Sequence, residues 1–427
     1  MPTRPADPVR VARWGLFVLT LVNLFNYIDR FVVASLVESL KRSELHLSDA
    51  QLGWLATGFI LVYMLTSPIF GTLGDRGKRP RLIAAGVAIW SVATALGGFA
   101  RSFATLFLAR STVGVGEAAY GTVSPALLAD YFPVERRGRV FAVFSAAIPI
   151  GSAAGYVLGG LVDHYFGWRA AFFVAGVPGL LLAYMTSRLF DPPRGAQDGA
   201  AAPEATHAHG AAIGRQALAA YASLLRNVPY TLTVLGYAAY TFALGALAFW
   251  TPAFLERERG LARTDATVQF GAIVVVTGFV GTFFGGWLGD RLLRRFRESY
   301  LWVSGVSTLA AVPFAWVAFT ARDRGVYTAA IVVAEMLVFM STGPINSAII
   351  NVVAPDRRAT AVALSILAIH LLGDVPSPPL VGYVSDISSL GKAMLILPVA
   401  FAVSGLIWIF AAWRGERSVA QRAGSAG

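Results

Sequence analysis

Two charged residues, Asp29 and Arg30, end the stretch NYIDR, inside an apolar run that begins near Trp14. A second pair, Arg110 and Glu117, lies in another long apolar run. At a bilayer centre each such charge costs at least about 2.5–3.5 kcal/mol, so it must face a partner or a water-filled cavity. A buried carboxylate can take up a proton, whereas arginine keeps its charge. The four residues predict acid–base chemistry inside a membrane, with Asp29 and Glu117 as the proton-binding groups.

Helix geometry predicts that these charges meet. At a rise of 1.5 Å per residue, Asp29 lies about 15 Å below the outer end of its helix, Arg110 about 10 Å and Glu117 about 21 Å. Arg110, Gly114 and Glu117 are spaced i, i+4 and i+7, so they share one face and the glycine leaves room. We expect the two charges of NYIDR to face Arg110 and Glu117. Protonation of either acid would then release Arg110 and bias a two-state element. A static cluster that only fixes packing is the alternative.

The composition indicates which elements must position these charges. The chain of 427 residues is 56% hydrophobic and 14% charged, with a mean hydropathy of +0.62. Soluble proteins average about 25% charged residues. Because about 20 apolar helical residues span the hydrocarbon core, we predict an all-α integral membrane protein with twelve transmembrane helices. The predicted helices cover 14–39, 48–73, 81–100, 103–130, 138–162, 168–190, 228–255, 267–289, 299–320, 326–352, 359–385 and 392–413.

The formal net charge of +11 reports topology and not nucleic-acid binding. Most of the 35 Lys and Arg residues fall in the loops of one side. By the positive-inside rule that side is cytoplasmic, so both termini are expected in the cytoplasm. The chain has no cysteine, which excludes disulfides and thiolate metal sites. The N-terminal residues lack a cleavage-site pattern, so we expect the first span to be retained.

A Pro-, Gly- and Ala-rich segment at 191–214 reads as a flexible connector. The next residues, 215–227, carry Leu218, Tyr221, Leu224 and Leu225 at helical spacing, which predicts an amphipathic surface helix. His207 and His209 in the connector are expected to be solvated and not to bind metal. We therefore predict three parts: a six-helix half at 1–190, a connector at 191–227 and a second half at 228–427.

Internal repeats support the two halves. GTLGDRGKRPR (71–81) follows the second predicted span, and GWLGDRLLRR (286–295) follows the eighth. PVERRGR (133–139) follows the fourth, and PDRRAT (355–360) follows the tenth. Each of the two repeated segments recurs after nearly the same number of residues. This predicts pseudo-symmetric six-helix halves with a substrate route between them.

The repeated G-x-L-G-D-R loop resembles the signature of the major facilitator superfamily. The fourth predicted span also resembles that superfamily's R-x-x-x-G-x-G motif. Glycines 151, 155, 159 and 160 of the fifth resemble a motif of antiporters, although close helix packing alone would explain them. In this family the loop's aspartate caps a neighbouring helix and its arginines brace the cytoplasmic gate, which fits helix-dipole electrostatics. The implied gate residues are Gly74, Asp75, Arg76, Arg79, Arg81, Asp290 and Arg291.

Three further signals are local. Ser48 and Gln51 match a capping box before the second span. His370 and Asp374 lie among three prolines in the eleventh span, which predicts a broken helix lining a cavity. His370 could titrate or simply hydrogen-bond a neighbour. Glu335 in the tenth span has no assignable partner.

NYIDR, R-x-x-x-G-x-G-E-A and HLLGD-x-PSP together resemble the Spinster branch of the superfamily, as found in bacteria. This resemblance implies proton-linked export of sphingosine phosphate or lysophospholipids. In a bacterium we expect a lysophospholipid or another amphiphilic anion, with tail contacts from aromatic residues of the seventh span that also include Phe242 and Trp250. The implied substrate-binding residues are Arg30, Arg110, Glu117, Tyr120, Tyr237, Tyr240, His370 and Asp374.

The sequence shows no phosphate-binding G-x-x-x-x-G-K-[ST] loop, metal cluster or nucleophile–base pair, so we expect no enzyme activity, cofactor or metal. We predict a proton-coupled secondary transporter of an amphiphilic, lipid-like anion that works by alternating access, with antiport as a further expectation. The expected setting is a monomer in the bacterial inner membrane, with protons and membrane lipids as its other partners. The alternatives are a proton-coupled drug or organic-anion carrier of the same fold, and a lipid receptor or scramblase without coupled transport.

Overall fold

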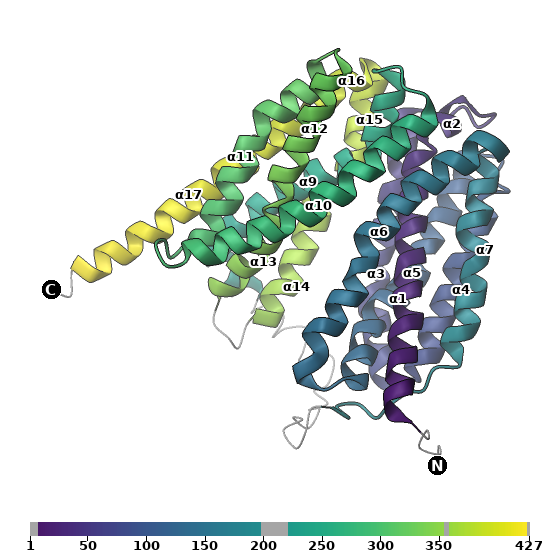
Figure 1. The fold of residues 1–427 in the computed structure, drawn as a ribbon, viewed down its shortest axis with the longest axis horizontal. Coiled ribbons are helices and arrows are strands. Elements are labelled where there is room, and N and C mark those ends of the chain that lie inside the picture. Colours follow the sequence, from purple (N-terminus) through teal and green to yellow (C-terminus); the bar gives the residue numbers. More distant parts are fainter. Residues whose placement is uncertain (1–6, 198–220, 354–357, 425–427) are drawn as a thin grey trace. The chain divides into compact units, whose positions relative to one another are not determined.

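The computed structural model describes residues 7–197, 221–353 and 358–424 (Figure 1). Every regular element in these ranges is a helix, and eleven helical segments there are long and apolar enough to cross a membrane. The predicted all-α membrane class is therefore confirmed. The remaining predicted span, 103–130, forms a 29-residue helix that is not among the eleven. At about 44 Å it is long enough to span a bilayer, and its charged residues Arg110 and Glu117 make it less hydrophobic.

The chain divides into two compact units: Met1–Ala205 with Leu261–Gly271, and Thr206–Gly260 with Ala272–Gly427. Most of the predicted connector, including His207, His209 and Leu218, lies outside the described residues. The helices before it are α1 (Pro8–Ser35), α2 (Val37–Arg42), α3 (Asp49–Arg76), α4 (Arg79–Gly97), α5 (Phe103–Tyr131), α6 (Val134–Phe166) and α7 (Trp168–Ser187).

The helices after the connector are more often interrupted. They are α9 (Val228–Arg257), α10 (Arg263–Leu292), α11 (Ser299–Thr320), α12 (Arg324–Phe339), α13 (Thr342–Asn351), α14 (Arg358–Ile369), the π-helical segment η3 (His370–Asp374), α15 (Ser377–Ile387), α16 (Leu390–Met394) and α17 (Ile396–Gly424). The tenth predicted span is thus two helices, and the eleventh is broken, as its prolines predicted.

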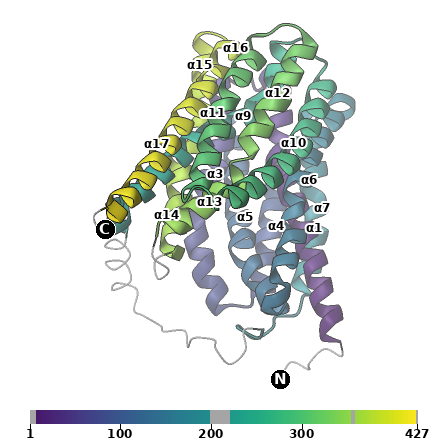
Figure 2. The ribbon, with the colours of Figure 1, turned by 60° about the vertical axis from the view of Figure 1, so that its left-hand side comes forward.

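Close packing in the second unit depends on small residues. Helix α17 runs along α11 (Figure 2). A methyl group added at Gly405 would lie 3.0 Å from the carbonyl oxygen of Gly305, so the two backbones meet there. The last residues of the predicted connector pack on this unit as well, because Leu224 is buried in a cluster with Tyr230 and Ile349. Leu224 therefore behaves as an apolar residue of the predicted amphipathic segment.

In the first unit, glycines of α6 bring this helix against α1. A methyl group at Gly151 would lie 2.6 Å from the carbonyl oxygen of Leu24, and one at Gly155 would lie 2.7 Å from that of Ile28. Real side chains do not tolerate such distances, so only glycine permits this approach. The contact at Ile28 fixes the backbone of α1 directly before Asp29. The glycine motif of the fifth predicted span is therefore explained by packing, and its link to antiport remains a prediction.

Helix α5 is held between two neighbours by the glycines of its R-x-x-x-G-x-G motif. A methyl group at Gly114 would lie 2.5 Å from the Phe59 carbonyl oxygen of α3. One at Gly116 would lie 2.4 Å from the Gly86 carbonyl oxygen of α4. The two positions face different helices because they are two residues apart. They fix the depth and rotation of α5, and with it the places of Arg110 and Glu117.

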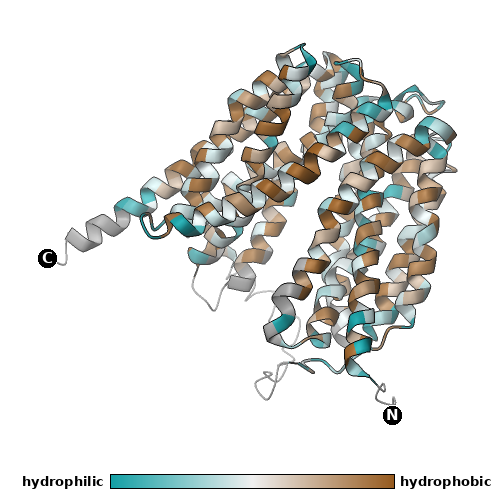
Figure 3. Cartoon of the chain, in the orientation of Figure 1, coloured by the Kyte–Doolittle hydropathy of each residue, from teal (hydrophilic) through white to brown (hydrophobic). Residues whose placement is uncertain are grey.

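Hydrophobic residues dominate the middle of the helices, and hydrophilic residues gather towards their ends (Figure 3). The predicted capping box at the start of α3 is present: the Ser48 hydroxyl accepts from the Gln51 amide, and the Gln51 side chain accepts from the Ser48 amide. Both features fit helices that exchange water for hydrocarbon along their length.

Candidate functional site

Asp29 of α1 and Arg110 of α5 form an ion pair inside the first unit. The Arg110 guanidinium donates to Asp29 Oδ1 at 3.1 Å. The Thr94 hydroxyl of α4 donates to the other carboxylate oxygen, Oδ2, at 2.7 Å. The side chains of Asp29 and Arg110 are only 1% and 3% exposed. Three helices therefore converge on one buried carboxylate, whose charge is balanced by one arginine.

Arg30 and Glu117 form a second pair beside the first. The Nε of Arg30 donates to Glu117 Oε2 at 2.6 Å. Glu117 is fully buried, whereas the Arg30 side chain is 27% exposed. Arg30 also lies over the rings of Tyr27, Phe59 and Tyr63, at 5.0–5.3 Å from their centroids. Such contacts stabilise a partly desolvated cation, so Arg30 is held against an aromatic wall while part of it remains accessible.

The structure brings the four predicted charges together, but it divides them differently from the expected scheme. Glu117 pairs with Arg30, and Arg110 pairs with Asp29. The reason is that adjacent residues on a helix point about 100° apart, so Asp29 and Arg30 meet different partners. In this arrangement protonation of Glu117 would release Arg30, not Arg110.

Each pair also has unused hydrogen-bonding capacity. The buried Nε of Arg110 and the buried Oε1 of Glu117 have no hydrogen-bond partner among the described residues. Buried polar atoms are normally paired. A further polar group would therefore be favourable at each of these two atoms.

Tyr120 was predicted to bind substrate, and the structure places it in helix packing. Its hydroxyl donates to the Leu19 carbonyl oxygen of α1 at 3.0 Å, and its ring packs edge-on against Trp90. It is 2% exposed. Its visible role is to connect α1 with α5 near the ion pairs, and a role in binding remains a prediction.

The eleventh predicted span forms a polar site in the second unit. His370 Nδ1 lies 2.9 Å from Asp374 Oδ1, and both side chains are partly exposed. These residues bound the π-helical segment η3, a type of irregularity that is often found at functional sites. Gly245 of α9 makes room for it, because a methyl group there would lie 2.6 Å from Asp374 Cβ.

The aromatic residues predicted on α9 differ in their exposure. Tyr237 is half-buried, and its ring lies tilted against that of Tyr240 with the centroids 6.1 Å apart. The Tyr240 hydroxyl donates to the Val338 carbonyl oxygen at 2.9 Å, and the Trp250 indole donates to the Pro378 carbonyl oxygen at 3.0 Å. Both Tyr240 and Trp250 are almost fully buried. In this structure Tyr237 is the more accessible of these three aromatic residues.

Glu335 of α12 is buried next to Thr277 of α10. The Thr277 hydroxyl donates to Glu335 Oε2 at 3.1 Å. The other oxygen, Oε1, is buried without a hydrogen-bond partner among the described residues. Thr277 is thus the partner that the sequence did not identify, and it is uncharged.

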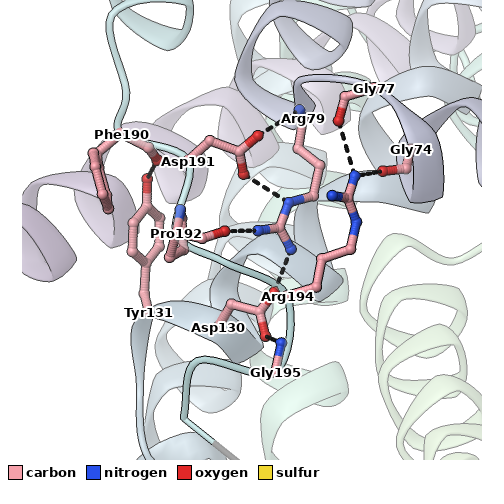
Figure 4. A network of polar contacts seen from close by, with 10 residues as sticks. All are labelled: Gly74, Gly77, Arg79, Asp130, Tyr131, Phe190, Asp191, Pro192, Arg194 and Gly195. Atoms are coloured by element: carbon pink, nitrogen blue, oxygen red, sulfur yellow. Dashed lines mark hydrogen bonds and ion pairs between the residues drawn. The ribbon is translucent and has the colours of Figure 1, made fainter. Parts of the chain in front are cut away.

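Arg79 is the centre of a second network, at the end of the first unit that carries the G-x-L-G-D-R loop (Figure 4). Its backbone amide and Nε both donate to the Asp191 carboxylate, at 3.0 and 2.8 Å. One terminal nitrogen donates to Asp130 Oδ2 and the other to the Pro192 carbonyl oxygen. Arg79 is 2% exposed. One buried guanidinium therefore holds together the start of α4, the end of α5 and the segment that follows α7.

Arg194 extends this network to the C-terminal end of α3. Its guanidinium donates to the carbonyl oxygens of Gly74 and Gly77 at 2.7 and 2.9 Å (Figure 4). A cation at a helix C-terminus is favourable because the last carbonyls carry partial negative charge. The Gly195 amide donates to Asp130 Oδ1 at 3.0 Å, so the same segment is tied to α5 as well.

The other predicted gate residues take several positions. The side chains of Asp75 and Arg76 lie outside the described part of the structure, and Arg81 is exposed. In the second unit, Asp290 accepts from the Tyr300 hydroxyl at 2.7 Å, and Arg291 lies over the Trp287 ring at 5.4 Å. The gate roles of all these residues remain predictions.

Four residues in these networks were missed by the sequence reasoning: Thr94, Asp130, Asp191 and Arg194. Asp130 and Asp191 each stand at the end of an apolar run, where an acid among basic loops was a usable signal. Arg194 follows two prolines at the start of the connector. Thr94 gave no signal, because a hydroxyl residue in a membrane helix commonly bonds its own backbone.

Comparisons with known proteins identify the family of the chain. The family model described as Major Facilitator Superfamily matches residues 19–373. The protein spinster of Drosophila melanogaster is 32% identical over 397 residues, and spinster homolog 1 of Xenopus tropicalis is 34% identical over 397 residues. The chain belongs to the Spinster branch of the major facilitator superfamily. These Spinster alignments cover 90% and 88% of the chain, but 64% of the fly protein and 74% of the frog protein.

A solved structure gives the same fold. The crystal structure of a bacterial homologue of the human lysosomal transporter Spinster, in an inward-facing and occupied conformation, has a TM-score of 0.82 to this Spinster-family chain. It is 22% identical, and the match covers 95% of this chain and 97% of that one. The predicted major facilitator fold is thus confirmed. The chain is a multi-pass membrane transporter and not an enzyme.

Proposed function

We propose that this transporter couples protons to the movement of an amphiphilic, lipid-like anion, such as a lysophospholipid, by alternating access. The observation that carries the proposal is the pair of buried acid–arginine contacts, Asp29 with Arg110 and Glu117 with Arg30. Membrane helices carry such charges at a considerable cost, which marks them as functional candidates.

The two carboxylates supply the coupling. A proton on Asp29 neutralises the only carboxylate paired with Arg110 among the described residues, and a proton on Glu117 does the same for Arg30. Each event leaves an arginine that is free to bind another anion. The Arg110 Nε, which has no hydrogen-bond partner among the described residues, could donate to such an anion. The deprotonated carboxylate and the substrate anion therefore compete for the same arginine. Proton binding to the acid thus favours anion binding to the arginine, and this links the two events.

Arg30 is the better candidate for the anionic head group, because its side chain is 27% exposed and that of Arg110 is 3% exposed. The rings of Tyr27, Phe59 and Tyr63 around it provide an apolar surface next to the charge. A charge beside an apolar wall suits an amphiphile. We assign further polar contacts to His370 and Asp374, and an aromatic contact to Tyr237.

The Arg79 network is proposed as the brace of the cytoplasmic gate. It joins the ends of α3, α4 and α5 with the segment that follows α7. We place this end, and both termini, in the cytoplasm because the basic loops gather there. The proposed setting is a bacterial inner membrane, with the monomer as the working unit.

The test is lysophospholipid flux into proteoliposomes of the full chain, with and without a pH gradient. Wild type should show flux that rises with the gradient. Asp29→Asn and Glu117→Gln should each lose the gradient dependence, while the exposed Asp265→Asn, at the start of α10, should keep it. Flux that is equal at all gradients in wild type would identify a scramblase, and binding without flux would identify a receptor.

A second candidate is a proton-coupled carrier of aromatic organic anions. It is favoured by one observation, the three rings that surround the accessible Arg30. In the same vesicles, an aromatic carboxylate would be taken up and lysophospholipid would be ignored. That outcome would keep the proton coupling and replace the substrate class.

A further inference from the structure

A basic cavity lies between the start of α1 and the end of α7, away from both ion pairs. Its volume is about 660 Å³. Both helix ends belong to the first unit. The lining residues are Arg10, Val11, Arg13, Trp14, Phe17, Arg188, Leu189 and Phe190.

The lining combines three arginines with three aromatic rings. All three arginines are exposed, and no ion pair involves them among the described residues. Arg188 lies over the Tyr184 ring at 5.1 Å. Trp14 and Phe17 are about half exposed and stack at 5.5 Å. Trp and Tyr residues gather at the level of lipid head groups, and Trp14 and Tyr184 are of these two types. The cavity therefore combines positive charge with the polarity of a membrane interface.

An apolar groove continues from this cavity along α1 and α6. Its volume is about 390 Å³, and it shares Arg13 and Phe17 with the basic cavity. The α1 positions follow helical spacing from Arg13 to Leu24, which is about 16 Å of helix. This distance is close to half of the roughly 30 Å hydrocarbon core. The residues lining it are Arg13, Leu16, Phe17, Thr20, Leu21, Leu24, Val143, Ala146, Ala147 and Ile150.

We propose that the cavity and groove together bind one diacyl anionic phospholipid of the leaflet next to the basic loops. The phosphate would lie among Arg10, Arg13 and Arg188, and one acyl chain would lie along α1 and α6. The charge selects an anionic head group, and no acidic side chain lines either space. The groove length selects a chain that ends near the bilayer centre. This lipid is a resident partner of the first unit and does not depend on the transported substrate.

The site is connected to the Arg79 network through the chain that ends α7. Phe190 lines the cavity, and its carbonyl oxygen accepts from the Tyr131 hydroxyl of α5. The next residue, Asp191, holds the buried Arg79. A lipid that fixes Arg188 and Phe190 would thereby stabilise the segment that braces the proposed gate.

The test is native mass spectrometry of the full detergent-purified chain, titrated with phosphatidylglycerol or phosphatidylcholine. Each arginine near an anionic lipid contributes about a fivefold preference, so wild type should prefer phosphatidylglycerol by on the order of 100-fold. The triple variant Arg10→Gln, Arg13→Gln, Arg188→Gln should lose that preference. The matched triple variant Arg294→Gln, Arg295→Gln, Arg297→Gln removes the same charge from an exposed loop and should keep it.

A second variant tests the groove independently of charge. Ala146→Trp fills the groove beside α1 and should weaken binding of the diacyl lipid at least tenfold while the three arginines remain. Glycerol phosphate, which lacks acyl chains, should not compete with the lipid. The proposal is overturned if the first triple variant keeps the wild-type preference, if both triple variants lose it equally, if Ala146→Trp binds normally, or if glycerol phosphate competes as well as the lipid.

Discussion

Neutralising Asp29 should destabilise the protein more than neutralising Glu117. Asp29→Asn leaves Arg110 without a carboxylate, and that arginine side chain is 3% exposed. Removing one partner of a buried ion pair typically costs about 3–5 kcal/mol, because an uncompensated charge remains. The hydrogen bond from Thr94 can still be made to an asparagine oxygen, so the loss comes mainly from the charge.

Glu117→Gln leaves Arg30 as the unpaired cation, and Arg30 is better stabilised by its surroundings than Arg110. The Arg30 side chain is 27% exposed and lies over three rings. After the carboxylate of Glu117 is lost, water and the cation–π contacts still stabilise the Arg30 charge. Each cation–π contact is worth about 0.5–2 kcal/mol. The substitution also removes a buried charge with one unpaired oxygen. We therefore expect a cost of about 1–3 kcal/mol, or roughly 2 kcal/mol less than for Asp29→Asn.

The assay is reversible unfolding in mixed micelles with increasing denaturing detergent, for wild type, both single variants, Arg110→Gln and the double variant Asp29→Asn, Arg110→Gln. The double variant should lose less than the sum of its single variants, with a coupling energy of about 2–3 kcal/mol. The reasoning is refuted if the free energy of unfolding of Asp29→Asn is within about 0.5 kcal/mol of the wild-type value. It is also refuted if the coupling energy is below about 0.5 kcal/mol.

Three further predictions concern the gate, the helix contacts and pH. Asp130→Asn should increase trypsin cleavage after Arg194 severalfold, because Arg79 and Gly195 lose the carboxylate that accepts their hydrogen bonds. The control is Arg81→Gln, at an exposed residue. Equal cleavage of the two variants would contradict the network. Gly155→Leu should lower the free energy of unfolding by about 1–3 kcal/mol through overpacking against Ile28. Gly286→Leu is the control: Gly286 has open space around it, so this variant should stay within about 0.5 kcal/mol of wild type. Equal free energies of unfolding in the two variants would argue against the α1–α6 contact. The hydrogen bond with its own backbone and the one from Arg169 lower the pKa of the Glu44 carboxyl, so its contribution is present at neutral pH and is lost as pH falls below the usual carboxyl range. Between pH 6 and pH 3.5 the melting temperature should therefore fall slightly more in wild type than in Glu44→Gln, and a larger fall in the variant would show the opposite sign.

Much of the helical framework follows from apolar run length. Prolines 68, 125, 149, 178, 252 and 313 lie inside helices, where rules for soluble proteins would place breaks. In a membrane, run length prevails because the backbone must stay hydrogen-bonded. The break between α12 and α13 was missed, although the sequence STGPIN at 341–346 places Gly343 and Pro344 there. One apolar run can thus hold two helices.

The site was predictable in part. The cost of charges in hydrocarbon indicated the four residues of the ion pairs, and helix rise put them at similar depths. Which acid meets which arginine depends on helix rotation, which is set by contacts such as Gly114 with Phe59 and Gly155 with Ile28. Those contacts join residues far apart in sequence. Spacing along one helix therefore could not distinguish the observed pairs from the expected release of Arg110 by Glu117.

The most direct test of the coupling is proton movement itself. Proteoliposomes loaded with a pH indicator receive lysophospholipid without an imposed gradient, and empty liposomes control for leakage. Wild type should show a change in internal pH that accompanies lipid flux, and the double variant Asp29→Asn, Glu117→Gln should show none. Proton movement that persists in the double variant, or lipid flux in wild type without any proton movement, would contradict the account.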